Sequence, residues 1–266
     1  MIKLFKLHEE IEDARAYFLE ALTPMVFTAK DGTELPYRLY VPAQYNPDHT
    51  YPLQIHLHGG GIRGNDNKFQ LYHDTEQTQM LFAHQFFEPF IFAIPQCPIE
   101  YFWSEFQFQT WPEGEKTYRP MAEVEENCIC RAVYELTEYL SEAYSIDKDR
   151  RYLSGCSLGS TGSYELIFRH PDTYAAALVG CGVSDPQTAS AVAHVPFYII
   201  HGEKDPIISV RYSRDMATAL EAAGADYVYI EIPNAEHNFF AYITNGPELM
   251  EDGMRWIHSK RRVQKK

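Results

Sequence analysis

The chain has 266 residues, of which 45% are hydrophobic and 14% aromatic, and it carries a formal net charge of -14 at pH 7. This composition excludes a disordered or fibrous protein, and the length suits one domain, residues 1–266, around a single large core. The excess of acidic side chains repels polyanions, so we expect no nucleic acid partner.

The sequence also argues against a membrane protein and against a disulfide framework. No apolar run approaches the ~18 residues of a membrane-spanning helix, and charged residues occupy the start of the chain, where a signal peptide would be apolar. We therefore expect no membrane partner and a cytoplasmic protein, with export open if a signal peptide has been removed. The five cysteines are unevenly placed and odd in number, which predicts neither a disulfide framework nor a metal site.

The first predicted elements are a helix and a hairpin. Residues 6–22 have amphipathic helical periodicity, which predicts an N-terminal helical extension over residues 1–24. Residues 25–28 and 35–41 have strand character on either side of the tight-turn pair Asp31-Gly32. We expect these two strands to pair with each other.

Short apolar strands separated by helical stretches make up the rest of the chain. Apolar residues recur at helical spacing around residues 124–140 and 210–220, between such strands. The six predicted strands cover residues 53–57, 90–94, 151–154, 175–179, 197–200 and 227–232. This alternation predicts an α/β fold with a mostly parallel central sheet of about eight strands and helices on both faces.

An irregular, aromatic-rich insertion covers residues 99–120. Long loops of this kind in a compact domain are usually functional or mobile. Trp103, Phe106 and Trp111 are our candidates for substrate binding, because flat rings stack on a phenolic acyl group or a sugar ring. A hydrophobic cap over the core and a contact in a homodimer explain the same residues equally well.

Ser157 is the candidate nucleophile. It is the central residue of a Gly155-x-Ser157-x-Gly159 motif, which is weak evidence alone. Here an apolar strand leads into the motif and a helical pattern follows it, as a nucleophile elbow requires. Small residues beside the serine allow the sharp turn that raises its hydroxyl above the sheet edge.

A serine hydroxyl needs a base, and elbow enzymes supply it in the order serine, acid, histidine. Asp205 follows the strand at 197–200 and is our candidate acid, with Asp185 as its rival. His237 follows the last strand and is our candidate base. The carboxyl ends of parallel strands share one edge of a sheet, so these side chains should meet.

Glycines 59–61 end an early strand and leave room for a substrate near the backbone. Acyl transfer needs N–H groups aimed at the developing oxyanion, and we assign that role to Gly60 and Leu158. A phosphate cradle is excluded because no Gly-Lys-Ser/Thr follows. His56 and His58 are expected to support this loop, since a third metal ligand at a sensible spacing is missing.

These residues resemble the α/β-hydrolases, in particular the esterases around carbohydrate esterase family one and the prolyl-oligopeptidase-like peptidases. The resemblance covers about residues 36–257. Residues 58–67 resemble the group's His-Gly-x-Gly-Glu-Arg-Gly-x-Asp-Asn segment, and residues 95–98 followed by Trp103 resemble its next marker. Ile62 departs from the usual glutamate, and Ser160-Thr161 replace a glycine common after the elbow.

The resemblance implies a serine hydrolase. Ser157 would attack an ester carbonyl, with His237 taking its proton, Asp205 holding the imidazole, and the Gly60 and Leu158 amides stabilising the oxyanion. An acyl-enzyme would form and water would release it, so no cofactor is expected. Feruloyl or acetyl esters of plant saccharides are the expected substrates. The alternatives are a serine peptidase acting on short peptides and a noncatalytic binding protein on the same fold.

Overall fold

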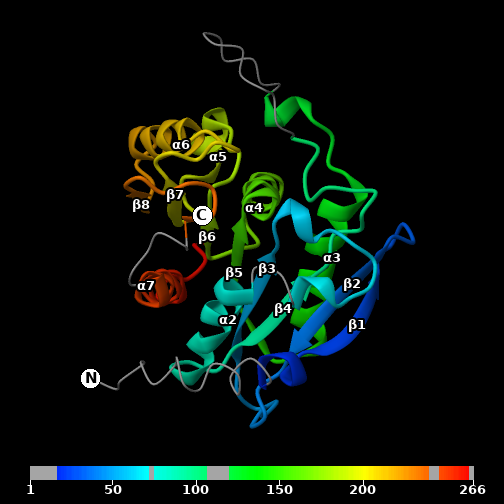
Figure 1. The fold of residues 1–266 in the computed structure, drawn as a ribbon. Helices are drawn as coiled ribbons and strands as arrows, with labels where there is room; N and C mark the ends of the chain where they lie inside the picture. Colours follow the sequence, from blue (N-terminus) through cyan, green and yellow to red (C-terminus); the bar gives the residue numbers. More distant parts are fainter. Residues whose placement is uncertain (1–16, 72–74, 107–119, 240–245, 264–266) are drawn as a thin grey trace.

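The structure, a computed structural model, describes residues 17–71, 75–106, 120–239 and 246–263. Eight strands form one sheet in the spatial order β1-β2-β4-β3-β5-β6-β7-β8 (Figure 1). The strands are β1 (Thr23–Thr28), β2 (Glu34–Tyr40), β3 (Tyr51–Leu57), β4 (Ile91–Pro95), β5 (Ile146–Cys156), β6 (Ala176–Gly180), β7 (Phe197–Gly202) and β8 (Tyr227–Ile232).

Most of the sheet is parallel. Strand β2 pairs antiparallel with both β1 and β4, whereas every neighbouring pair from β4 to β8 is parallel. The predicted hairpin is present, and Gly32 has the positive φ of 87° that its turn requires. The prediction of a mostly parallel, eight-stranded α/β fold is confirmed.

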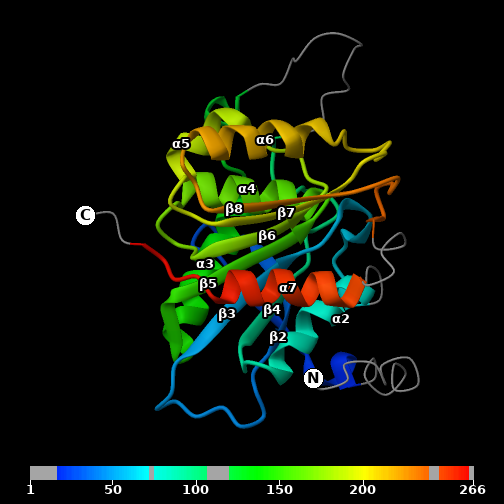
Figure 2. The same cartoon turned by 90° about the vertical axis from the view of Figure 1, so that its left-hand side faces the viewer.

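Helices cover both faces of this sheet (Figure 2). Helices α3, α4 and α6 contribute to one hydrophobic cluster, and α2 and α7 contribute to a second cluster on the other face. The helices are α2 (Thr75–Ala83), α3 (Cys128–Ala143), α4 (Leu158–Arg169), α5 (Ala189–Val192), α6 (Arg211–Ala222) and α7 (Gly246–His258). Among the short 3-10 helices, η1 (Gly60–Ile62) follows β3 and η3 (His84–Phe86) follows α2.

The alternation of side chains along β4 explains the two-sided core. Ile91 and Ala93 face the cluster that contains α3, and Phe92 and Ile94 face the cluster that contains α7. Successive side chains of a strand point to opposite faces, so a strand that is buried on both faces is apolar throughout.

Most predicted strands agree with the structure to within two residues, and the larger differences concern β5, the N-terminal helix and the insertion. Strand β5 begins at Ile146, five residues before the predicted start at residue 151, because Tyr51 of β3 pairs with Ile146 beyond a register shift. Of the predicted N-terminal helix, residues 17–21 are helical, and residues 6–16 lie outside the described residues. Residues 107–119 of the insertion also lie outside them. Within the described part of the chain, no helix is long and apolar enough to cross a membrane.

Candidate active site

The structure brings Ser157, Asp205 and His237 together at the carboxyl edge of the sheet. They follow β5, β7 and β8, and the two hydrogen bonds that join them connect residues far apart in the sequence. Nε2 of His237 lies 2.9 Å from Oγ of Ser157, and its Nδ1 lies 2.6 Å from Oδ2 of Asp205. A proton can therefore pass from Ser157 to an imidazole that a carboxylate orients.

The turn at Ser157 has strained backbone geometry. Its φ is 55° and its ψ is -119°, a backbone conformation that residues other than glycine rarely adopt. Helix α4 starts at the next residue and lies close to β3: a Cβ atom on Gly159 would overlap the carbonyl oxygen of Leu57. The glycine therefore lets the helix approach the sheet, which raises the Ser157 hydroxyl above the strand ends.

Ser160 and Thr161, the departures from the usual glycine, join α4 to the neighbouring strand. Oγ of Ser160 lies 2.6 Å from the carbonyl oxygen of Gly180 and accepts the Gly180 N–H at 2.8 Å. Oγ1 of Thr161 accepts the N–H of Val183 at 3.0 Å. These hydroxyls therefore link α4 to the end of β6 and to the loop that follows it.

Four hydrogen bonds hold the Asp205 carboxylate. Oδ1 accepts from the N–H groups of Ile207 and Ile208 at 2.8 and 2.9 Å, and Oδ2 accepts from His237 and His201. Burial alone would raise the pKa of Asp205, but the donors, led by His201 and His237, outweigh it and hold the pKa below its usual value. The carboxylate is therefore ionised and fixed in place.

His201 is a residue that the sequence analysis did not assign. It is fully buried at the end of β7, and its Nδ1 lies 2.7 Å from Oγ of Ser213. Its Nε2 lies 2.9 Å from the carbonyl oxygen of Ile208 and 3.2 Å from Oδ2 of Asp205. An Nε2–H donor satisfies both oxygens, with Ser213 donating to Nδ1. The sequence offered one signal of this role: His201 lies at a strand end, four residues before the candidate acid.

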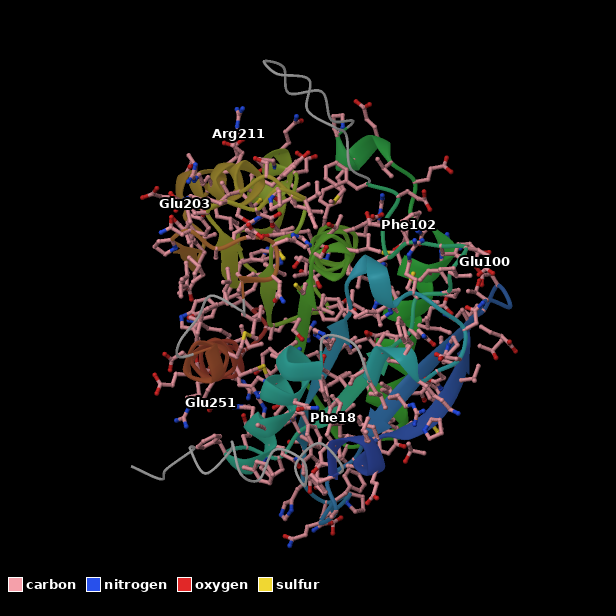
Figure 3. The ribbon with its side chains drawn as sticks, viewed as in Figure 1. Phe18, Glu100, Phe102, Glu203, Arg211 and Glu251 are labelled. Carbon is pink, nitrogen blue, oxygen red and sulfur yellow. The ribbon has the colours of Figure 1, made fainter. Side chains whose placement is uncertain are left out.

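The predicted oxyanion donors lie side by side. A Cβ atom on Gly60 would be 3.7 Å from Cδ2 of Leu158, so η1 packs on the first residue of α4. Arg63 holds this loop: its Nε–H donates to the Gly60 carbonyl at 3.1 Å, and Nη1 donates to the Tyr101 carbonyl at 3.0 Å. Its guanidinium also lies 4.1 Å from the ring centre of Phe102, which Figure 3 labels.

His58 also holds this loop in place. Its Nδ1 lies 2.8 Å from the Gly59 carbonyl oxygen, and its Nε2 accepts the Cys97 N–H at 3.0 Å. Burial lowers the pKa of His58 to about 4, so the ring is neutral and keeps both hydrogen bonds. Nδ1 of His56 lies 3.0 Å from Oγ of Ser154, between the neighbouring strands β3 and β5.

Trp103 and Phe106, the candidate aromatic residues of the insertion that the structure describes, are buried, whereas Tyr101 is exposed. Trp103 is 1% exposed and donates from Nε1 to the His58 carbonyl at 2.9 Å, and Phe106 is 3% exposed. Ser104, between them, hydrogen-bonds to the buried Glu165 of α4. These contacts anchor the start of the insertion to the fold. Substrate binding by Trp103 and Phe106 stays a prediction, and Trp111 lies outside the described residues.

Asp185, the rival acid, serves a different part of the fold. Its Oδ2 accepts the Met121 N–H at 2.8 Å, and its Oδ1 accepts the Gln187 N–H at 2.9 Å. Both contacts hold backbone N–H groups in place, and the carboxylate that hydrogen-bonds to His237 is Asp205.

Two groups of side chains in the described parts of the chain have atoms close enough to share a metal ion. The first consists of Cys181, Asp205 and His237, whose histidine and carboxylate already hydrogen-bond to each other. The second consists of His84, Glu88 and His258 and lies away from this site. The sequence analysis expected no metal site and did not single out the second group.

Comparison with known proteins identifies the family. The model of the dienelactone hydrolase family matches residues 91–252, more than half of the chain, and this range includes Ser157, Asp205 and His237. The chain belongs to the dienelactone hydrolase family. The predicted relationship to the α/β-hydrolases is therefore confirmed.

This dienelactone hydrolase family member is similar to several esterases. A thermostable esterase has a TM-score of 0.77 and 28% identity, over 92% of this chain and 64% of that chain. A CE1 ferulic acid esterase from Anaeromyces mucronatus has a TM-score of 0.61 over 90% of both chains, but its 15% identity shows the fold alone. Esterase LipQ of Mycobacterium tuberculosis is 44% identical over 59 residues, which are 20% of this chain and 14% of LipQ. The chain thus spans less than two thirds of the thermostable esterase.

Proposed function

We propose that this hydrolase-family chain is a serine carboxylesterase. The observation that carries the proposal is the continuous hydrogen-bond chain from Oγ of Ser157 through His237 to Asp205. It contains a nucleophile, a base and an orienting carboxylate in the order that serine catalysis needs. A noncatalytic binding protein has no use for this arrangement or for the strained turn that presents Ser157.

In the proposed reaction, Ser157 attacks the ester carbonyl while His237 accepts the serine proton at Nε2. Asp205, with its depressed pKa, stabilises the imidazolium that forms. The backbone N–H groups of Gly60 and Leu158 stabilise the oxyanion, and the positive end of the α4 dipole adds to this effect. His237 then protonates the leaving alcohol, and a water molecule activated by His237 releases the acid from the acyl-enzyme.

The proposed substrates are feruloyl or acetyl esters of plant saccharides. The motif resemblance to carbohydrate esterase family one and the aromatic insertion support this substrate class, as does the fold shared with the ferulic acid esterase. A peptide substrate is the competing proposal, and the same assay tests it.

The test compares kcat/KM for methyl ferulate, p-nitrophenyl acetate and a peptide anilide in wild type, Ser157→Ala and Ser163→Ala. Ser163 is the matched control, because its hydroxyl donates to the Gly159 carbonyl within α4. We expect ester turnover to fall by roughly 10⁴-fold or more in Ser157→Ala and to persist in Ser163→Ala. Retained ester turnover in Ser157→Ala would refute the mechanism, and preferred cleavage of the anilide would refute the esterase proposal.

A preference for methyl ferulate over p-nitrophenyl acetate would support the feruloyl substrate, because such selectivity requires contacts that favour one transition state. Equal or faster turnover of the acetate would instead support the acetyl esters. Little turnover of both esters would contradict the proposed substrate class.

A further inference from the structure

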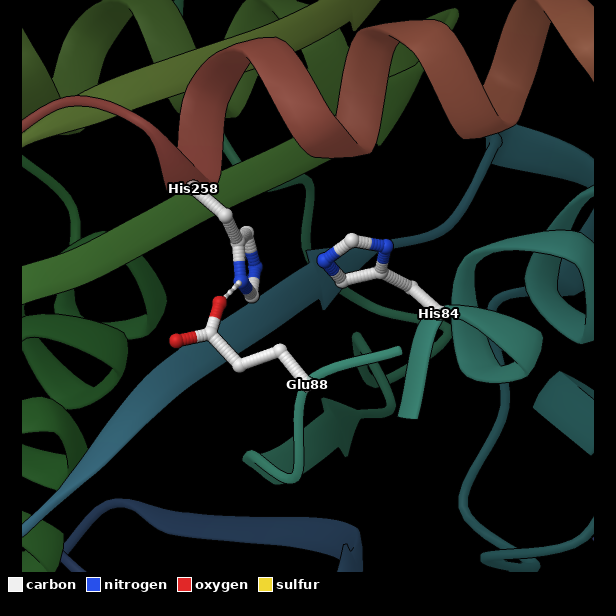
Figure 4. Close-up of side chains that lie close together, drawn as sticks. All are labelled: His84, Glu88 and His258. Carbon is white, nitrogen blue, oxygen red and sulfur yellow. Dashed lines mark hydrogen bonds and ion pairs between the residues drawn. The ribbon is translucent and has the colours of Figure 1, made fainter. Parts of the chain in front are cut away.

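His84, Glu88 and His258 form a cluster beside the carboxyl-terminal end of α7 (Figure 4). One nitrogen of each imidazole and one oxygen of Glu88 all lie within 4.8 Å of one another. Glu88 contacts Arg150 in the first half of β5, whereas Ser157 follows the end of that strand. The cluster therefore lies at the amino-terminal ends of the parallel strands and is separate from the proposed catalytic residues.

The two histidines of the cluster face their carboxylates differently. Nδ1 of His84 lies 3.2 Å from Oε1 of Glu251, a residue of α7 that Figure 3 labels, so with Nδ1–H donating, Nε2 of His84 keeps a lone pair. Metal-binding histidines are commonly oriented by a carboxylate in this way. Nδ1 of His258 lies 3.1 Å from Oε2 of Glu88, a separation that suits two ligands of one ion, so His258 would bind through Nδ1.

The other ring nitrogens are buried and unsatisfied. Within the described residues, Nε2 of His84 and Nε2 of His258 have no hydrogen-bond partner, and the two side chains are only 4% and 3% exposed. A buried acceptor without a donor is unfavourable, and native proteins contain few of them. Nε2 of His84 is therefore a buried ligand atom that the cluster can offer to an ion.

Aromatic side chains pack around the two imidazoles. The centre of the His258 ring is 4.6 Å from that of His84, and it stacks on Tyr152 at 4.5 Å. Phe90 packs against both histidines. This packing limits the movement of both rings and keeps their nitrogens close together.

Glu88 can bind an ion without leaving Arg150 unpaired. Its Oε1 pairs with Arg150 at 2.6 Å, but Arg150 also pairs with Asp147 at 3.0 Å and would keep that partner. Glu251 is paired with Arg255 at 2.6 Å. The Glu88 side chain is 34% exposed, so solvent reaches the cluster at this carboxylate.

We propose that His84, His258 and Glu88 bind a divalent transition metal ion such as zinc, with Glu251 orienting His84. Two imidazoles and one carboxylate are a typical donor set for such ions. The ion would link η3 to the end of α7. These two segments are far apart in the sequence: His84 and Glu251, which are in contact, are separated by 167 residues. Its role would be to stabilise the fold, because the cluster is remote from the proposed catalytic residues.

The test uses the full chain stripped with a chelator, with zinc titrated against a chromophoric chelator and Tm recorded alongside. Zinc at Cys181, Asp205 and His237 is the main competing outcome, so the titration is repeated in His237→Ala. We expect one zinc per chain that raises Tm, is retained in His237→Ala, and is lost in His84→Gln. Glu251→Gln should weaken binding by about 10- to 100-fold, as expected for a partner that orients a ligand.

Glu88→Gln and His170→Gln complete the set. Glu88→Gln replaces a ligand that is partly exposed, so this variant tests the proposal if His84→Gln does not fold. It should also lose high-affinity zinc binding. His170 pairs with Glu126 at 2.8 Å but belongs to neither metal group, so His170→Gln should bind zinc like wild type. Unchanged zinc affinity in both cluster variants, loss of zinc in His237→Ala, or no binding by wild type would overturn the proposal.

Discussion

His201 contacts Asp205 at the carboxylate oxygen that also accepts the hydrogen bond from His237. The distance from Nε2 of His201 to Oδ2 of Asp205 is 3.2 Å, and both side chains are completely buried. His201 touches no predicted reacting atom, so it is a positioning residue that fixes the carboxylate, which in turn fixes the imidazole.

Replacing His201 with leucine should therefore impair turnover more than substrate binding. A lost hydrogen bond to a charged group corresponds to about 1.5–3 kcal/mol, or roughly a 10- to 100-fold fall in kcat, with KM little changed. His201→Gln retains an amide donor and should recover part of the loss. Steady-state kinetics on p-nitrophenyl acetate measure both variants, and equal kcat in His201→Leu and wild type would contradict the positioning role.

Asp205→Asn should lower kcat by about 10⁴-fold, because the amide no longer stabilises the imidazolium or selects its tautomer. Asp185→Asn is the matched control: Asp185 is also buried in a loop after a strand, but its carboxylate accepts hydrogen bonds from the backbone N–H groups of Met121 and Gln187. We expect that variant to keep its turnover per folded molecule. The opposite ranking of the two variants in a p-nitrophenyl acetate assay would reassign the acid to Asp185.

The depressed pKa of Asp205 also predicts a dependence of stability on pH. The unfolded chain has the ordinary pKa of 3.8 and the folded chain a lower one, so Asp205 stabilises the folded state above about pH 4. This contribution is lost as the pH falls through the folded-state pKa. Urea unfolding at pH 7, 5, 4 and 3 should show the stability difference between wild type and Asp205→Asn shrinking below about pH 4. A difference that stays constant to pH 3 would contradict this prediction.

Gly159→Ala should destabilise the protein by about 3 kcal/mol or more, because a Cβ atom there would overlap the backbone of Leu57 and force α4 away from β3. Gly61→Ala is the control, since a Cβ atom on Gly61 meets nothing within 4 Å. Urea denaturation of both variants measures the effect. Equal stability of Gly159→Ala and wild type would show that the helix does not need this close approach.

The sequence predicts the fold and the proposed triad well because both depend on local pattern. Apolar strands that alternate with helical periodicity define the parallel sheet, and chain order places Ser157, Asp205 and His237 after three of its strands. The carboxyl ends of such strands share one edge, so spatial proximity follows from topology alone.

The supporting contacts are not predictable in the same way. His201, Arg63 and the cluster at His258 depend on pairing between segments that are distant in sequence, and no motif marks a buried histidine as a partner of a particular carboxylate. Strand β5 is also longer than its apolar core, because Ile146, ahead of the charged residues 147–150, still pairs with Tyr51 of β3. Tertiary contact decides such boundaries, and local pattern does not reveal it.

Arg63→Met should reduce catalysis without changing the proposed triad. Arg63 connects the Gly60 carbonyl to the Tyr101 carbonyl, so its loss frees the loop that carries a proposed oxyanion donor. Complete removal of one such donor costs about 10²–10³-fold in kcat, and a loosened donor should cost roughly tenfold. Methionine keeps much of the apolar stem of Arg63 but loses the guanidinium that lies over the Phe102 ring, so a modest loss of stability should accompany the fall in kcat.

The matched control for Arg63→Met is Arg214→Met, which removes an arginine that pairs with Glu231 at the edge of the sheet. We expect Arg214→Met to leave kcat unchanged. Arg63→Met should lower kcat for methyl ferulate and p-nitrophenyl acetate by the same factor, because both esters develop the same oxyanion. A fall confined to the ferulate would instead place Arg63 in the acyl-binding region, and unchanged turnover of both esters would show that the loop keeps its geometry without Arg63.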